Sequence, residues 1–321
     1  MKKNAGFTLV ELLIALVLSI VIVGAVYATF NSQQKSFSLT NEKTDMQQQG
    51  RAAMNWLMRD LRMAGCLVPT SKAIRIVNHN IPDGTTPASD EITLIFADQR
   101  FDGLTIQSSS GSPPTTVTVE VQSGGSFAPN NNDYVNKNIV LVNQDETHSV
   151  IRRITQVSGT GTQRTLTLGN LDSYLSGLTP AFNSSNDNSA SYAGGNAYVL
   201  TTRTYDVQSE TLYINDHNDG TSSGTPQPLA EGAEILQFDF HMSDGSTQSD
   251  PTAGSHTIDQ SRAVRIYLLM KNIVKDTDYA DTLTYTLGAG NAVFTPNSSS
   301  SLRPYRRRLL TTLVRLRNFG L

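Results

Sequence analysis

Glu11 is the only charged residue between Phe7 and Phe30, a run that is otherwise almost entirely apolar. A carboxylate inside a membrane is costly, and such residues are therefore usually paired and functional. Two interpretations are open: Glu11 pairs with a cationic group, or its side chain snorkels toward the cytoplasmic interface. Pairing is favoured, because a short charge-assisted contact is strong where water is excluded.

The apolar run from Phe7 to Phe30 is long enough to cross a bilayer. Its 24 residues give about 36 Å of helix at about 1.5 Å per residue, against a hydrocarbon core of about 30 Å. An ordinary secretory signal has a shorter apolar region that precedes a small-residue cleavage site. Here the small residues Ala5 and Gly6 come before the apolar run. Cleavage there would leave the hydrophobic helix attached.

The basic residues around this run predict its orientation. Lys2 and Lys3 precede it, and the next basic residue is Lys35. By the positive-inside rule the N-terminus is cytoplasmic, and the chain beyond about residue 30 lies on the far side of the membrane.

The segment Gly6-Phe7-Thr8-Leu9-Val10-Glu11 resembles the leader junction of type IV pilins and type II secretion pseudopilins. The resemblance implies that a membrane peptidase cleaves between Gly6 and Phe7 and then methylates the new amino group of Phe7. It also implies that Glu11 meets the terminal amine of an adjacent subunit and sets the axial register of a filament.

A helical period continues beyond the apolar run. Small and apolar residues recur at steps of three and four, as in one face of a helix; they are Gly50, Ala53, Met54, Leu57, Met58, Leu61 and Ala64. Gly65 and Pro69 predict the end of the helix. The stretch from Gln47 to Cys66 resembles the corresponding segment of PilW-type minor pilins.

From about residue 70 the pattern changes to short β-rich runs separated by Gly, Pro, Ser and Asn. The predicted strands are Glu91–Ala97, Thr115–Val121, Asn138–Val142, Ser149–Val157, Arg164–Leu168, Ala197–Asp206, Thr211–Ile214, Ile235–Met242, Ala263–Lys271, Thr282–Leu287 and Leu309–Arg317. Alternation in Ile235–Met242 predicts a half-buried strand with Gln237, Asp239 and His241 on its polar face.

Long loops are predicted between these strands, and loops of this length are usually binding surfaces or poorly ordered. They are Asn80–Asp90, Gln107–Pro114, Gln122–Asp133, Asn183–Asn196, Asn215–Pro228, Ser243–Gln260 and Gly288–Ser301.

The arginine-rich ending, Arg303 to Arg317, allows two interpretations. Six arginines in fifteen residues could contact nucleic acid or lipid. The alternation from Leu309 to Leu316 instead favours a closing strand with arginines on its solvent face and at its start. The net charge of −3 argues against nucleic acid as a main ligand. This ending and the strand near Ala263 also resemble the PilW and pseudopilin J group.

No catalytic or metal-binding pattern stands out. The five histidines have no zinc-ligand spacing, and no nucleophile elbow or phosphate-binding loop is present. The segment from Asp216 to Gly220 superficially suggests calcium, but its glycine falls one position too early for an EF-hand. Cys66 is the single cysteine, so no intrachain disulfide forms. Burial as a small hydrophobe is favoured for Cys66 over an intermolecular bridge.

Together these features predict an α+β fold, in which a long N-terminal hydrophobic and amphipathic helix packs on a β-rich, largely antiparallel head with long loops. The expected parts are a leader (1–6), a transmembrane and filament-core helix (7–30), its amphipathic continuation (31–66) and a periplasmic or extracellular head (67–321).

The resemblance implies a minor pilin of the PilW type that takes part in assembly or priming of a type IV pilus, with a place at its tip. Its expected partners are other minor pilins, the major pilin, the prepilin peptidase and N-methyltransferase, and the inner-membrane assembly platform. It is expected in the inner membrane and then in the pilus, with no cofactor, metal or enzymatic activity. The alternatives are a J-like minor pseudopilin of type II secretion and a pilus-tip adhesin.

Overall fold

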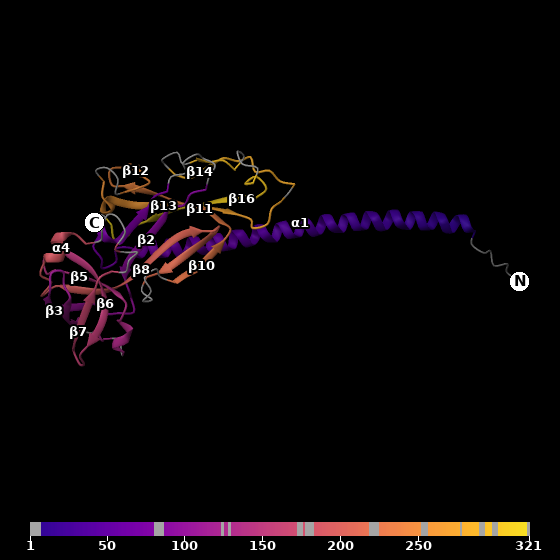
Figure 1. Cartoon of the computed structure of the whole chain (residues 1–321). Coiled ribbons are helices and arrows are strands. Elements are labelled where there is room, and N and C mark those ends of the chain that lie inside the picture. The colour runs from indigo at the N-terminus through magenta and orange to yellow at the C-terminus, as the bar shows by residue number, and fades with distance from the viewer. Residues whose placement is uncertain are drawn as a thin grey trace. The chain divides into compact units, whose positions relative to one another are not determined.

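The structure is a computed structural model (Figure 1). It describes residues 8–79, 87–122, 125–127, 130–171, 176, 183–217, 225–251, 256–276, 278–288, 293–296 and 301–319. The chain divides into two compact units, residues 1–48 and 49–321, which are described separately below.

Helix α1 runs from Leu9 to Met63, over 55 residues, and its residues up to 48 make up the described helix of the first unit. It ends where Gly65 adopts a positive φ of 76°, a conformation that glycine accepts without strain. The N–H of Ala64 still donates to the carbonyl of Asp60, and the side chain of Asn318 donates to the carbonyl of Ala64. Cys66, just beyond the helix, is free and half-buried rather than buried.

The second unit contains a ten-stranded antiparallel sheet and a four-stranded antiparallel sheet. The strands of the large sheet are β1 (Ile74–Val77), β2 (Glu91–Ala97), β3 (Leu104–Ser110), β4 (Thr116–Val121), β5 (Asn138–Val142), β6 (Ser149–Ser158), β7 (Gln163–Gly169), β8 (Asn196–Gln208), β9 (Thr211–Asp216) and β10 (Thr225–Glu231). The short helix α2 (Thr70–Ala73) lies between α1 and β1, and the short helix α4 (Ser185–Ser189) lies between β7 and β8.

Six of these strands close into a barrel, because β8 pairs with both β3 and β5. The ring runs β8, β3, β4, β7, β6, β5 and back to β8. The barrel core is apolar and includes Ile106, Val119, Ile139, Ile154 and Leu166. The second half of β8 leaves the ring and pairs with β2 and β9. Strand β8 therefore belongs to both the barrel and the rest of the large sheet.

The four-stranded sheet has the order β12-β11-β13-β16. Its strands are β11 (Ala233–Met242), β12 (Thr247–Gln248), β13 (Ser261–Lys271) and β16 (Arg307–Arg315), and a separate short hairpin is formed by β14 (Tyr285–Thr286) and β15 (Val293–Phe294). Figure 1 labels β11, β12, β13, β14 and β16 in the orange and yellow part of the chain.

The C-terminal part of α1 packs against this sheet. A Cβ atom added to Gly50 would lie 2.5 Å from Cδ1 of Leu310, so the helix and the sheet approach closely here and the Leu310 side chain would have to shift for any larger residue. The hydroxyl of Thr312 lies 3.5 Å from the sulfur of Met58. Leu57 and Leu61 are almost completely buried, as the predicted apolar stripe requires.

The predicted α+β class and all eleven predicted strands are confirmed, although Thr282–Leu287 shrinks to the two residues of β14. Five of the described strands were missed: β1, β3, β10, β12 and β15. Strand β3 ends in three serines and was assigned partly to a loop. Strand β10 contains Pro226 and Pro228 and pairs only with β9, an edge position in which proline is tolerated.

Strand β11 is buried on both faces, so the prediction of a half-buried strand was wrong. Gln237 and Asp239 are 3% and 2% exposed. The hydroxyl of Tyr267 donates to Asp239 at 2.9 Å, and the same face of the sheet packs against Tyr285 and Phe294 of the β14–β15 hairpin. This later segment covers the face that alternation assigned to solvent.

Candidate assembly site on the N-terminal helix

Thr8 and Glu11 form a reciprocal hydrogen-bonded cap at the start of α1. A carboxylate oxygen of Glu11 accepts from the backbone N–H and from the hydroxyl of Thr8, both at 2.9 Å. The backbone N–H of Glu11 donates to the Thr8 hydroxyl at 3.3 Å. This is a capping box, which satisfies two N–H groups that a helix start leaves without intrahelical partners.

This capping role of Glu11 was not predicted, although the sequence carries a signal for it. A Thr followed three residues later by Glu and then by an apolar run is a helix-start signature. All bonds to Glu11 described above go to one carboxylate oxygen, Oε2. The cap therefore leaves the Oε1 atom for a further donor, and capping and pairing with a cation are compatible.

Gly6 and Phe7, the predicted cleavage and methylation positions, lie outside the described residues. The first described residue is Thr8, immediately after them. The structure therefore describes the acceptor carboxylate of the predicted site, but not the amine that cleavage would create.

The first half of α1 presents apolar side chains all round. Leu9, Ile14, Val21 and Phe30 are each more than half exposed, and the helix is long and apolar enough to cross a membrane, with a mean hydropathy of 2.9 over its best window. The hydroxyl of Ser19 donates to the carbonyl of Ala15 at 2.7 Å, which satisfies it without water. This surface suits lipid or other apolar helices.

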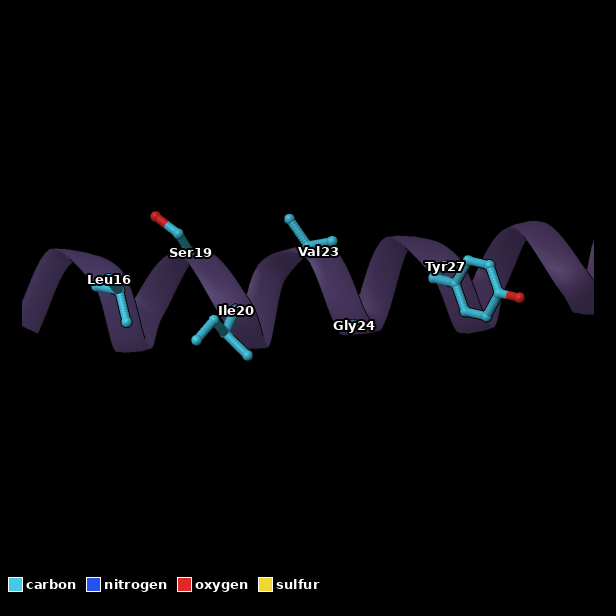
Figure 2. A pocket seen from close by; sticks show the side chains of 6 residues that line it. All are labelled: Leu16, Ser19, Ile20, Val23, Gly24 and Tyr27. Atoms are coloured by element: carbon cyan, nitrogen blue, oxygen red, sulfur yellow. The ribbon is translucent and has the colours of Figure 1, made fainter.

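A shallow groove follows one face of this half of the helix (Figure 2). Its lining residues recur at steps of three and four; they are Leu16, Ser19, Ile20, Val23, Gly24 and Tyr27. A Cβ atom added to Gly24 would meet nothing within 4 Å. Small residues at such positions let the backbone of a second helix approach closely in an apolar environment.

A buried ionic network joins the end of α1 to β8 within the second unit. Asp60 is 1% exposed and lies 3.0 Å from Nη1 of Arg203. The hydroxyl of Tyr205 donates to the same carboxylate oxygen at 2.6 Å. Burial and the neighbouring Asp60 carboxylate raise the pKa of Tyr205. Tyr205 therefore stays neutral and serves as a donor.

The arginines at the start of β16 are structural. Arg307 has a fully buried side chain that contacts Glu234 at 2.5 Å and Asp281 at 3.1 Å. Arg306 contacts Asp276 at 2.9 Å. The prediction that these arginines lie on a solvent face was therefore wrong for Arg307, whose charge is balanced by two carboxylates inside the protein.

Among the described residues, the side chains of Asp244, Ser246 and His256 form the group most like a catalytic triad. The Nε2 atom of His256 lies 3.0 Å from Asp244 and 3.5 Å from the Ser246 hydroxyl. In a triad the acid and the nucleophile contact different ring nitrogens of the histidine. Here both contact the same one, and the Ser246 hydroxyl donates to Asp244 itself at 2.7 Å. This arrangement does not activate a nucleophile.

Among the described residues, no group of three or more His, Cys, Asp and Glu side chains is placed to hold a metal ion. Of the segment that resembled a calcium loop, only Asp216 and His217 are described. His217 is 3% exposed and its Nε2 atom lies 2.9 Å from the hydroxyl of Thr204, an arrangement that suits packing.

Comparison with known families gives two matches. The family described as type IV pilus-assembly protein W matches residues 197–318, from β8 to just beyond β16. The prokaryotic N-terminal methylation motif matches residues 1–27. No curated protein matches the chain.

Among solved structures, a type IV-like pilin from Thermus thermophilus is similar over 85% of this chain and 96% of its own, with 12% sequence identity and a TM-score of 0.38.

The two family matches lie at the two ends of the chain, and each coincides with a feature described above. The methylation motif covers the predicted cleavage sequence, the capped helix start and most of the exposed apolar half of α1. The other match covers the four-stranded sheet against which α1 packs. Together the two matches support a type IV pilin of the PilW type that takes part in pilus assembly with other pilins and the membrane-associated pilus machinery.

Proposed function

We propose that this pilin is a minor, non-enzymatic subunit that helps to prime type IV pilus assembly and remains near the pilus tip. The observation that carries the proposal is the position of Glu11, a lone carboxylate in the first turn of an exposed apolar helix.

In this proposal the prepilin peptidase cleaves between Gly6 and Phe7, and Phe7 is then N-methylated. The subunit is held in the inner membrane by a single span, with its N-terminus in the cytoplasm and its head in the periplasm, as Lys2 and Lys3 favour. The assembly platform then transfers it into a filament with other minor pilins and the major pilin. The direct partners are proteins rather than nucleic acid.

Glu11 has two roles in the proposal. Its Oε2 atom caps the helix through Thr8, and its negative charge attracts the terminal amine of a neighbouring subunit. The pairing is strong because water is excluded from the apolar core of the filament. A subunit at the extreme end would have no such amine to neutralise, so the presence of Glu11 favours a position with another subunit above it.

Mass spectrometry of sheared surface filaments and of membranes from the same cells tests the proposal. We expect a mature N-terminus of N-methylated Phe7 and co-purification with pilus subunits. Co-purification with secretion-channel proteins would instead support a J-like minor pseudopilin of type II secretion. An intact N-terminus at Met1 in assembled filaments would contradict the proposed processing.

Three variants separate the two roles of Glu11. Glu11→Gln keeps an oxygen acceptor for the Thr8 N–H but removes the charge, Glu11→Ala removes both, and Thr8→Val removes only the hydroxyl of the cap. We expect incorporation into filaments, measured by immunoblotting of sheared material, to fall about tenfold or more in both Glu11 variants and to persist in Thr8→Val. Normal incorporation of Glu11→Gln would contradict the charge-pairing role.

A further inference from the structure

Strand β16 lies at one edge of the four-stranded sheet. On its inner side it pairs with β13 in a regular antiparallel register, from Ala263 opposite Arg315 to Lys271 opposite Arg307. At the two ends of this ladder, the N–H of Leu316 donates to the carbonyl of Arg262, and the N–H of Asn272 donates to the carbonyl of Arg306.

These two end bonds determine which backbone groups of β16 remain open. Hydrogen-bonded and non-hydrogen-bonded pairs alternate in an antiparallel ladder, so the even-numbered residues bond to β13. The odd-numbered residues direct their N–H and C=O groups away from the sheet. Among the described parts of the chain, no hydrogen bond reaches the backbone of Leu309, Thr311 or Leu313 on this outer side.

The side chains beside this open edge are basic. Arg265 of β13 lies opposite Leu313, and Arg315 follows two residues later on the same face. Both arginines are exposed, and Leu313 between them is 54% exposed. Within the described residues neither arginine has an ion-pair partner, whereas Arg307 on the same strand contacts two carboxylates.

The charge of this edge decides what it can accept. A strand edge offers a row of donors and acceptors to any extended segment. A second copy of β16 placed antiparallel on the first would bring like charges together, which is destabilising. An extended segment in which carboxylate side chains alternate with apolar ones would pair with Arg265 and Arg315 while its backbone forms hydrogen bonds with the edge.

We propose that the open edge of β16 binds an extended acidic segment of another protein as an added β-strand. The backbone of Leu309, Thr311 and Leu313 supplies the hydrogen bonds. Arg265 and Arg315 supply the preference for carboxylates, and Leu313 packs against an apolar side chain between them. This inference does not depend on the processing or the register role proposed above, because it concerns the head alone.

Fluorescence anisotropy with the full-length protein in detergent tests the proposal. The probe is a labelled nine-residue peptide in which Glu and Val alternate, matching the nine residues of β16. The first control peptide has Lys in place of Glu. The second carries N-methyl groups on alternate residues, which removes the N–H donors that would face the edge. We expect only the unmethylated acidic peptide to bind.

Two protein variants locate the binding. Leu313→Pro removes an outward N–H without removing a ladder bond, a substitution that edge strands tolerate. The double variant Arg265→Glu with Arg315→Glu reverses the charge of the edge. We expect each to weaken binding of the acidic peptide about tenfold or more, comparable to the loss of one or two hydrogen bonds. The double variant should bind the lysine peptide instead.

A matched double charge reversal, Arg59→Glu with Arg153→Glu, changes arginines of α1 and of the barrel strand β6 and should leave binding unchanged. Thermal unfolding of each variant establishes that the head is folded. The proposal is overturned if the acidic peptide does not bind the native protein, or if it binds Leu313→Pro and the Arg265→Glu, Arg315→Glu variant as tightly as the native protein. Binding of a DNA duplex without binding of the peptide would also overturn it.

Discussion

At the scale of single residues, two neighbouring carboxyl groups at the start of β2 have unusual proton affinity. Burial raises the pKa of Asp90 to about 7. The hydrogen bonds that its carboxylate accepts from the backbone N–H groups of His79 and Phe238 lower this pKa, but they do not offset the effect of burial. Burial and the charge of Asp206 raise the pKa of Glu91 to about 7. Both groups bind a proton more tightly in the folded protein than in an unfolded chain, where such carboxyls titrate near 4.

This difference predicts how the stability of the head depends on pH. Between about pH 4 and pH 7 the folded state holds more protons than the unfolded state, so the free energy of unfolding decreases as the pH rises through this range. The Glu91→Gln variant removes one of the titrating groups. We expect this variant to have a free energy of unfolding at pH 8 that is higher by on the order of 1 kcal/mol, a modest value because Glu91 is partly exposed. Its melting temperature should therefore be raised at pH 8 and should be almost unchanged at pH 4.

Melting curves of the native protein and of the Glu91→Gln variant across this pH range measure the effect. Glu146→Gln, at an exposed position, is the matched control and should melt like the native protein at every pH. A Glu91→Gln variant with the full pH dependence of the native protein would contradict the assignment.

At the scale of elements, the contact between α1 and β8 depends on one buried carboxylate. Asp60→Ala leaves Arg203 and the Tyr205 hydroxyl without the acceptor that they share. Removing one partner of a buried ion pair costs about 3–5 kcal/mol. The Arg203 side chain is 24% exposed, so we expect a smaller loss, about 2–3 kcal/mol, since water partly replaces the lost acceptor.

Urea unfolding followed by the fluorescence of Trp56, the single tryptophan, measures this loss. Asn55→Ala is a suitable control, because Asn55 is exposed on the same helix. Equal unfolding midpoints for Asp60→Ala and Asn55→Ala would show that the network contributes little to stability.

The elements also show what the sequence could predict. The helix and most strands were predicted because their signals are local: the steps of three and four around Leu57, and the alternation around Phe238. The capping box at Thr8 was just as local and was overlooked. The pairing of β8 with both β3 and β5, and the covering of β11 by a segment some fifty residues later, are non-local contacts. Such contacts leave no periodic trace in either strand.

At the scale of the whole molecule, the barrel is inserted between two strands that pair with each other. Ala97 at the end of β2 lies opposite Leu200 of β8, and the N–H of Asp98 donates to the carbonyl of Val199 at 2.8 Å. The chain thus leaves for the barrel and returns at adjacent points. Strands β3 to β7 also precede the region matched by the PilW family, which begins at residue 197.

We expect a variant in which residues 98–199 are replaced by a two-residue Asn-Gly turn to fold, because this turn suits an antiparallel hairpin of β2 and β8. Its stability should be lower, since Ile95 and Leu200 lose their packing against Val140 and Ile151. Cooperative thermal unfolding and immunoblotting of sheared filaments measure folding and incorporation. Loss of cooperative unfolding would show that the barrel is needed for the rest of the head to fold.

The closed ring of the barrel affects how the heads of two subunits can contact each other. An open sheet has unpaired edges, and these promote strand pairing between copies of a protein. In the ring, each described strand of the barrel has a neighbour on both sides along the stretch that closes it. Two such barrels can therefore meet without β-sheet growth from one barrel to the next.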